Sequence, residues 1–319
     1  MSGRPSGVLG RLGRAVGGVA LVGTACVAYG TFIESASYRV RRVDVPVLKP
    51  GSEPLRVLHL SDAHLLPMYA RRRAFLRSLA GLEPDLVVST GDSLAGEDGL
   101  PALIESLGRL LDVPGVFVFG SNDYVAPRMK NPVRYLWRAT GKPAPQRASL
   151  PTEELRAAFT SRGWLDLNDR RAELTIRGQR FAFRGTDDAH EHRDDYPAVA
   201  GPADPDAVNI GVTHAPYLRM LDAMTADGVE MIFAGHTHGG QVCVPGRGAL
   251  TSNCDLPVQH AKGLFRHTTG DKTSWVNVSA GIGMSPYAPF RFACPPEVSL
   301  LTLVPRAEGA SARRTGRLK

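Results

Sequence analysis

Short apolar runs recur along the chain, and polar residues that can bind a metal or a proton follow each of them. The runs at 55–60, 85–89, 116–119, 208–212 and 231–234 have the length and composition of buried β-strands. Ligands bind at the carboxyl ends of strands in open α/β sheets, so we expect the residues after these strands to converge on one crevice. These residues are Asp62, His64, Asp92, Asn122, Asp123, His214, His236 and His238.

Segments with the periodicity of a helix lie between several of these runs. Apolar residues at 100, 103, 104, 107, 110 and 111 lie on one face of a helix, and those at 75, 76 and 79 make a shorter one. Further on, 180–184, 275–278 and 298–304 have the pattern of strands with few helices between them. We therefore predict an α/β fold in which a two-sheet β-sandwich is flanked by α-helices, with the later strands forming the second sheet.

An uncharged apolar segment at 15–33 precedes these elements and follows a basic tail at 1–14. Its 19 residues are long enough to cross a bilayer as a helix, which predicts a transmembrane or signal-anchor segment. A cleaved signal peptide is the alternative, because Ala28 and Ala36 offer small-residue cleavage sites. We expect a linker at 34–42, one domain at 43–305 and a basic, disordered tail at 306–319.

The net charge of +7 belongs to the ends of the chain. Residues 1–42 carry +5 and residues 306–319 carry +4, so the remainder carries −2 by difference. A body without net positive charge argues against nucleic-acid binding, whereas basic flanks suit anionic lipid headgroups. We expect a single-pass protein of the cell membrane. We expect its domain on the extracytoplasmic side, although Arg39, Arg41 and Arg42 after the apolar segment offset the positive charge before it.

The strongest local motif is the heptapeptide from Gly235 to Gln241, in which His236 and His238 lie one residue apart between glycines. Glycine allows sharp backbone turns, and neutral imidazoles are common metal ligands. A single pair of this kind is also typical of an exposed loop. The metal-binding interpretation therefore depends on the pair following the last of five strands that all end in similar residues.

Five short motifs follow the five strands in order. They are Asp62-x-His64, Gly91-Asp92, Gly120-Ser121-Asn122-Asp123, His214 and Gly235-His236-Thr237-His238. In this order they resemble the calcineurin-like metallophosphoesterases over about residues 43–304. The segments 239–241, 262–265 and 291–297 resemble more narrowly a membrane-linked bacterial branch, related to UDP-2,3-diacylglucosamine hydrolases.

This resemblance implies a site for two divalent metal ions, Mn, Fe or Zn, with Asp92 bridging them. Asp62, His64 and His238 would bind the first ion, and His214 and His236 the second. A metal-bridging hydroxide would attack a phosphoester or pyrophosphate bond, and we expect a lipid-linked or nucleotide-sugar substrate. The alternatives are a phosphodiesterase of soluble substrates tethered to the membrane, and a membrane-anchored metal-binding regulatory protein with little turnover.

The third motif departs from the usual Gly-Asn-His-Asp, because Ser121 and Asn122 replace the Asn and the His. We favour Asn122 as the ligand of the second metal, since an amide carbonyl is a better ligand than a neutral hydroxyl. The alternative is that Ser121 coordinates and Asn122 binds the substrate. Because the usual general-acid His is missing, we name Asn122, Asp123 and His190 as catalytic candidates.

Other groups have simpler interpretations. The charged loop at 186–195 that contains His190 is either a substrate-facing loop or a solvated one. We expect His59 in the core or an interface, and His260 and His267 at the surface. The four cysteines do not settle the compartment, and one disulfide, between Cys243 and Cys254, is conceivable.

Overall fold

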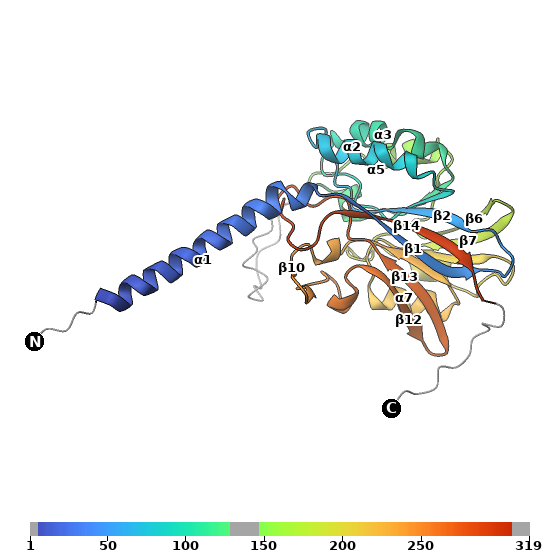
Figure 1. The fold of residues 1–319 in the computed structure, drawn as a ribbon. Coiled ribbons are helices and arrows are strands. Elements are labelled where there is room, and N and C mark those ends of the chain that lie inside the picture. The colour runs from blue at the N-terminus through green and yellow to red at the C-terminus, as the bar shows by residue number, and fades with distance from the viewer. Residues whose placement is uncertain (1–5, 128–146, 308–319) are drawn as a thin grey trace, which may run out of the picture.

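Two six-stranded sheets form the centre of the fold in a computed structural model, which describes residues 6–127 and 147–307 (Figure 1). Strands β2, β3, β4 and β5 are parallel, whereas β14 runs antiparallel to β2 and parallel to β1. The first sheet has the order β1 (Arg39–Leu48), β14 (Glu297–Pro305), β2 (Leu55–Leu60), β3 (Leu86–Ser89), β4 (Gly115–Phe117) and β5 (Leu165–Asp166).

The second sheet is parallel at its centre and antiparallel at both edges, where β12 pairs with β13 and β6 with β7. Its order is β12 (Gly263–Thr269), β13 (Lys272–Val278), β9 (Met231–Ala234), β8 (Val208–Val212), β7 (Gln179–Gly185) and β6 (Arg170–Ile176). Strands β8 and β9 are buried along their whole length, which explains their mainly apolar sequence.

Apolar side chains of both sheets meet in one layer, where Val57 and Val88 of the first sheet join Ile210 and Phe233 of the second. Helices α2 (Ala70–Ser78), α3 (Gly99–Leu107) and α5 (Thr152–Thr160) contribute to the core on the other face of the first sheet. Helix α7 (Leu218–Ala226) packs in a third cluster with β9 and β13. The predicted two-sheet α/β sandwich with outer helices is therefore confirmed.

Short elements connect these layers. They are α4 (Ser121–Tyr124), α6 (Tyr196–Val199), the hairpin of β10 (Cys243–Val244) and β11 (Gly248–Ala249), and the 3-10 helices η1 (Glu34–Ala36), η2 (Leu79–Leu82), η3 (Gly108–Asp112), η5 (His238–Gly240) and η6 (Val258–His260). The cysteines are free thiols, and Cys243 packs with Cys294 rather than with Cys254. The conceivable Cys243–Cys254 disulfide is therefore not formed.

The division of strands between the sheets differs from the prediction. Strands β2, β3 and β4 lie in one sheet and β8 and β9 in the other, while β14 joins the first sheet rather than the second. Strand periodicity reports burial but not the pairing partner, and for this reason the sequence could not divide the strands correctly.

The domain boundaries also shift. Helix α1 (Ser6–Phe32) begins inside the expected basic tail, and β1 begins at Arg39, inside the expected linker. The segment 17–36 is long and apolar enough, by length and composition, to cross a membrane. Most of the tail expected at 306–319 lies outside the described residues.

Candidate metal centre

The loops after the strands hold the predicted ligands in an uncommon backbone conformation. Asp62, His64, Asp92, His236 and His238 all have positive φ, between 38° and 67°. Residues other than glycine rarely adopt this conformation, and such strain is concentrated at functional sites. The strain turns each side chain sharply away from the direction of its strand, towards the space between the sheet edges.

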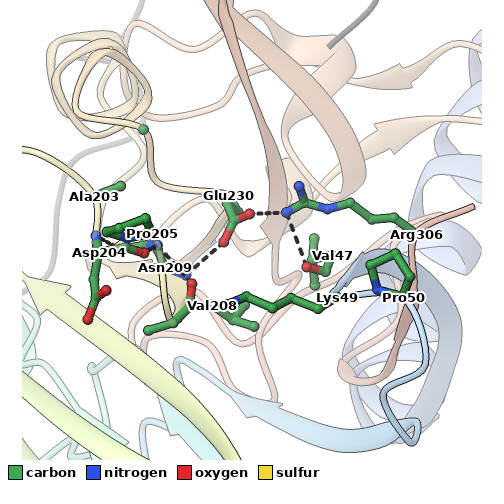
Figure 2. Close-up of a pocket in the computed structure, with 12 residues that line it drawn as sticks. Val47, Lys49, Pro50, Ala203, Asp204, Pro205, Val208, Asn209, Glu230 and Arg306 are labelled. Carbon is green, nitrogen blue, oxygen red and sulfur yellow. Dashed lines mark hydrogen bonds and ion pairs between the residues drawn. The ribbon is translucent and has the colours of Figure 1, made fainter. Parts of the chain in front are cut away.

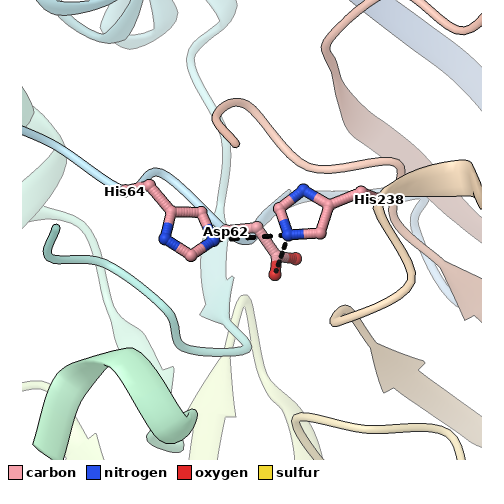
Figure 3. Close-up of side chains that lie close together, drawn as sticks. All are labelled: Asp62, His64 and His238. Carbon is pink, nitrogen blue, oxygen red and sulfur yellow. Dashed lines mark hydrogen bonds and ion pairs between the residues drawn. The ribbon is translucent and has the colours of Figure 1, made fainter. Parts of the chain in front are cut away.

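A first group consists of Asp62, His64 and His238, which point toward one another in Figure 3. The Nε2 atoms of the two histidines lie 3.3 Å apart, and His238 Nε2 lies 3.5 Å from Asp62 Oδ1. His238 Nδ1 donates to the Gly283 carbonyl at 3.1 Å, so the lone pair of His238 is on Nε2, inside the group. This tautomer is suited to metal binding.

A second group consists of Asp62, Asp92 and His214, all fully buried. His214 Nδ1 donates to the Thr90 carbonyl at 2.7 Å, and His214 Nε2 lies 3.7 Å from Asp92 Oδ1. The other Asp92 oxygen lies 3.4 Å from His64 Nε2. Asp92 therefore faces both groups, one carboxylate oxygen to each, and Asp62 is a member of both.

His236 and His190 lie at the side of the second group. The His236 ring is 5.2 Å from the His214 ring and 4.3 Å from the His190 ring, measured between centroids. His236 Nε2 contacts the Asn253 carbonyl at 3.2 Å, and His190 Nδ1 lies 3.0 Å from the Tyr217 hydroxyl. His190 is half-buried, so the loop at 186–195 places this ring beside the predicted ligands rather than in solvent.

The two exchanged residues of the third motif point in different directions. The Ser121 hydroxyl donates to Asp188 at 2.6 Å, away from the two groups. Asn122 donates to Asp92 from both its backbone N–H, at 2.7 Å, and its side-chain Nδ2, at 2.6 Å. Its Oδ1 accepts from Arg147 at 3.2 Å, so the amide oxygen, the expected metal ligand, faces Arg147 in this structure.

Asp123 does not fit the catalytic role that we predicted. Its carboxylate is buried and accepts the backbone N–H groups of Asp92, Ser93 and Gly120 at 2.7 to 3.0 Å. These three hydrogen bonds hold the buried carboxylate against the loops of Asp92 and Gly120. Asp123 is a positioning residue that holds the loop of Asp92, and the correction follows from contacts that a motif does not reveal.

Burial and charge separate the pKa values of the two central carboxylates. Burial raises the pKa of Asp62 to about 6. Burial acts on Asp92 too, but His214, His64 and hydrogen bonds from Asn122 hold the pKa of Asp92 well below its usual range. Burial opposes the charge on His214, yet Asp92 and Asp62 raise its pKa to about 9.

The other imidazoles among the candidate ligands have lowered pKa values. Burial lowers the pKa of His64 to about 4 and lowers the pKa values of His236 and His238 well below the usual value. Neutral imidazole is the form that binds a metal ion. Burial, with the charge of Asp92, raises the pKa of Asp123 to about 7.

Unpaired polar atoms test whether a cation fits. Asp62 Oδ1 and His214 Nε2 are buried and have no hydrogen-bond partner among the described residues. An unpaired buried carboxylate oxygen is costly, and a divalent cation bound to both atoms would remove that cost. Carboxylate and imidazole together suit Mn, Fe or Zn. The residues therefore fit the ions that the sequence implied.

A chain of buried hydrogen bonds reaches the centre from the core and was missed by the sequence analysis. Asn277 donates to His59 Nδ1 at 2.8 Å, and His59 Nε2 lies 3.0 Å from the Thr90 hydroxyl. Thr90 donates to Ser61 at 2.7 Å, and Ser61 donates to Asp62. His59 is thus a core residue, as expected, and it also orients a predicted ligand.

Two buried arginines support the same loops and were also missed. Arg72 donates to the Ala63 and His64 carbonyls at 2.9 and 2.6 Å. Arg291 donates to the Gly283 carbonyl at 2.6 Å and to the His238 carbonyl at 3.3 Å. The two guanidinium groups thus supply hydrogen-bond donors to backbone carbonyls of the loops that carry the candidate ligands.

A cavity of about 260 Å³ lies away from this centre (Figure 2). Its lining includes Val208 at the start of β8 and Glu230 just before β9, the opposite ends of the strands that precede His214 and His236. Arg306 contacts Glu230 and the Val47 carbonyl across it. None of the predicted site residues lines this cavity.

Comparison with known proteins gives a consistent family. The sequence model described as calcineurin-like phosphoesterase matches residues 55–240. The uncharacterized protein YpbG of Bacillus subtilis is 28% identical over 234 residues, covering 71% of this chain and 78% of that one. The uncharacterized metallophosphoesterase YkuE of the same organism is 23% identical over 279 residues, 85% of each chain.

Two further similarities are partial. A transmembrane protein with metallophosphoesterase domain from Bos taurus is 27% identical over 216 residues, 64% of this chain but only 45% of the bovine one. Among solved structures, a 5'-nucleotidase precursor from Thermus thermophilus aligns with a TM-score of 0.42 at 13% identity, covering 78% of this chain and 55% of that one.

Proposed function

Because the chain belongs to the calcineurin-like phosphoesterase family, we propose that it hydrolyses a phosphoester or pyrophosphate bond at a centre holding two divalent metal ions. Membership of this family confirms the predicted class of phosphoester hydrolase. The observation that best supports a two-ion centre is the position of Asp92, whose two oxygens face two different groups of side chains. We assign the ligands Asp62, His64, Asp92, Asn122, His214, His236 and His238.

Contacts support five of these ligands, whereas Asn122 and His236 are assigned from their places in the sequence motifs. Asp62, His64 and His238 form the first group, and His214 belongs to the second. His236 Nε2 lies 3.2 Å from both the Asn253 carbonyl and the Asn253 side-chain Nδ2, and these contacts fix its ring beside His214. When bound, the two ions would activate a water molecule and neutralise the phosphoryl oxygens.

Other side chains would supply a proton to the leaving group and a cation to the phosphoryl oxygens. We assign His190 as the proton donor to the leaving group, because its ring lies beside that of His236 and the Tyr217 hydroxyl orients it. Arg147, held against the Asn122 amide and the Ala126 carbonyl, places a cation beside the same centre and would contact a phosphoryl oxygen. Asn122 itself fixes the Asp92 carboxylate through two hydrogen bonds.

A lipid-linked or nucleotide-sugar substrate remains our proposal, as does the branch related to UDP-2,3-diacylglucosamine hydrolases. The apolar helix α1 supports a membrane-anchored enzyme. We propose the extracytoplasmic side for its domain. The rival proposal is a phosphodiesterase of soluble substrates, whose membrane anchor only determines its location. The exchange at Ser121 and Asn122 favours a second kind of function, a metal-binding regulatory protein with little turnover.

The test uses the full chain, purified in detergent, with Mn²⁺ and bis-p-nitrophenyl phosphate. We expect hydrolysis by the wild type and at least about a 100-fold loss in Asp92→Asn, because the carboxylate that faces both groups loses its charge. Asp44→Asn, at an exposed position of β1, is the matched control and should keep full activity. Bound metal without turnover on a panel of phosphoesters would overturn the enzyme and favour the regulatory protein.

A further inference from the structure

Helix α1 leaves the body at the edge that carries the candidate metal centre (Figure 1). The Gly30 carbonyl accepts from the Arg291 backbone N–H at 3.3 Å, and the Tyr29 and Phe292 rings meet edge to face at 6.4 Å. The Arg291 side chain in turn donates to the His238 carbonyl. One residue therefore connects the end of the helix to a proposed metal ligand.

The end of α1 is also fixed in position. The Glu34 carboxylate is buried and accepts the backbone N–H groups of Ala293 and Cys294 at 2.9 and 2.7 Å. Only two residues separate η1 from the start of β1 at Arg39. If α1 crosses a bilayer, this short and clamped connection keeps the body at the membrane surface, with the edge beside the end of α1 facing the lipid.

Large apolar side chains are exposed on loops at this edge. Met68, four residues after His64, is 77% exposed, and Tyr287 is 51% exposed. In the β10–β11 hairpin and just after it, Val244 is 39% and Leu250 64% exposed. We call Met68, Val244, Leu250 and Tyr287 the apolar rim. Exposed apolar groups collected around a site indicate a surface that something apolar covers.

The loops of the apolar rim contact one another. Gln241, which precedes the β10–β11 hairpin, donates to the Ala288 and Phe290 carbonyls at 2.8 and 2.9 Å. Gly283, at the start of the Tyr287 loop, donates its N–H to the Asp62 carbonyl at 2.6 Å. The hairpin, the Tyr287 loop and the strand-end loop that leads to Met68 therefore form one continuous border beside the end of α1.

We propose that the apolar rim inserts into the surface of the bilayer that α1 crosses, and that the substrate is an amphiphile whose phosphoester lies at the headgroup level. Only the second part of this inference, the amphiphilic substrate, rests on the proposed function. The occupant is a lipid surface because the border is continuous with α1, whose own apolar residues Val19, Leu21 and Val22 are exposed. The exposed Arg247 at the tip of the hairpin suits anionic lipid.

The first experiment detects the contact without using activity. The full chain carrying Tyr287→Trp is reconstituted in phosphatidylcholine and phosphatidylglycerol vesicles that contain nitroxide-labelled lipid, and the signal of the wild type, with its three tryptophans, is subtracted. We expect strong quenching at position 287. Asp271→Trp, in the turn between β12 and β13, is the control and should show little. Equal, weak quenching at both positions would overturn the lipid contact, as would a concentration-dependent dimer in its place.

The second experiment compares two substrates with the same leaving group. Hexadecyl p-nitrophenyl phosphate is presented in vesicles and bis-p-nitrophenyl phosphate in solution. In the triple variant Met68→Ser, Leu250→Ser, Tyr287→Ser we expect about a tenfold loss on the amphiphile, because less apolar area enters the interface, and less than a twofold change on the soluble ester. Equal losses on both substrates would overturn the amphiphile assignment. Quenching at position 287 with no hydrolysis of either substrate by the wild type would instead refute the proposed function and leave the lipid contact standing.

Discussion

At the residue scale, His59 keeps its place only as a neutral imidazole. It is fully buried, and burial lowers its pKa to about 3. It accepts from Asn277 on Nδ1, so its proton is on Nε2, where it donates to Thr90. A second proton would break the bond to Asn277 and disturb the hydrogen-bond chain that ends at Asp62.

This gives a pH dependence of known sign. In the unfolded chain the histidine takes up a proton below about pH 6.5, whereas in the folded protein it stays neutral down to about pH 3. The stabilisation is therefore complete above pH 6.5 and is lost as pH falls toward 3, by up to about 1.4 kcal/mol per pH unit. In His59→Gln we expect a correspondingly shallower decline of the free energy of unfolding.

The measurement is denaturant unfolding of the metal-free protein between pH 3 and 7. The absolute stability of His59→Gln should fall, because the hydrogen-bond chain is altered, but the change of slope is the relevant result. His260→Gln, a half-buried histidine stacked on Phe265, is the control. Parallel pH profiles for the wild type and His59→Gln would show that the buried imidazole does not contribute in this way.

The exchanged pair in the third motif gives a second prediction. Asn122→Ala removes a side chain that donates to Asp92, so we expect kcat to fall about 10- to 1,000-fold. Ser121→Ala loses only a bond to Asp188, and kcat should change less than about fivefold. Steady-state kinetics of the two variants, with metal content measured in parallel, separates the residues. A larger loss in Ser121→Ala would restore Ser121 as the metal ligand.

At the element scale, the clamp on the end of α1 is a buried carboxylate. Glu34→Ala would leave the N–H groups of Ala293 and Cys294 unpaired, at a cost of about 1 to 3 kcal/mol. We expect the segment between α1 and β1 to open more often and chymotrypsin to cut after Tyr38 about tenfold faster. Glu53→Ala, at an exposed position before β2, is the control. Unchanged cleavage would mean that Tyr38, stacked on Phe75, holds the segment by itself.

The elements also show how far the sequence could predict the molecule. Strands β2, β8 and β9 have the predicted bounds, because their mainly apolar runs reflect burial along most or all of each strand. Strand β1 was missed, since arginines alternate with its valines and it lies at the sheet edge. The sheet to which β14 belongs depends on pairing between distant segments, which local periodicity does not contain.

The candidate centre was predicted through residue types at strand ends, and the contacts around it were not. Asp62, His64 and His238 approach one another at loops that share an uncommon backbone conformation, which the sequence did not predict. Arg147, Asn253 and Tyr217 come from loops and helices without a motif, and only the folded chain brings them to Asn122, His236 and His190. The contacts of Asp123 with three backbone N–H groups could not be predicted for the same reason.

At the scale of the whole molecule, the candidate ligands come from both sheets. Asp62, His64 and Asp92 follow strands of the first sheet, whereas His214 and His238 follow strands of the second. Each group contains residues from both sheets: His238 is the second-sheet member of the first group, and His214 is that of the second group. An ion bound to either group would therefore hold the two sheets together at this edge.

Removal of metal should consequently lower the stability of the whole domain rather than of one loop. An ion present at 100 to 1,000 times its dissociation constant adds about 3 to 4 kcal/mol, because it binds the folded state alone. We expect EDTA to lower the Tm of the wild type by several degrees and Mn²⁺ in excess to restore it.

In His238→Ala, which removes the second-sheet member of the first group, EDTA should have a much smaller effect. His267→Ala, a histidine on β12 outside both groups, should respond like the wild type. If EDTA leaves the Tm of the wild type unchanged while metal analysis shows that ions were removed, the ions do not join the sheets, and the strained loops close this edge without them.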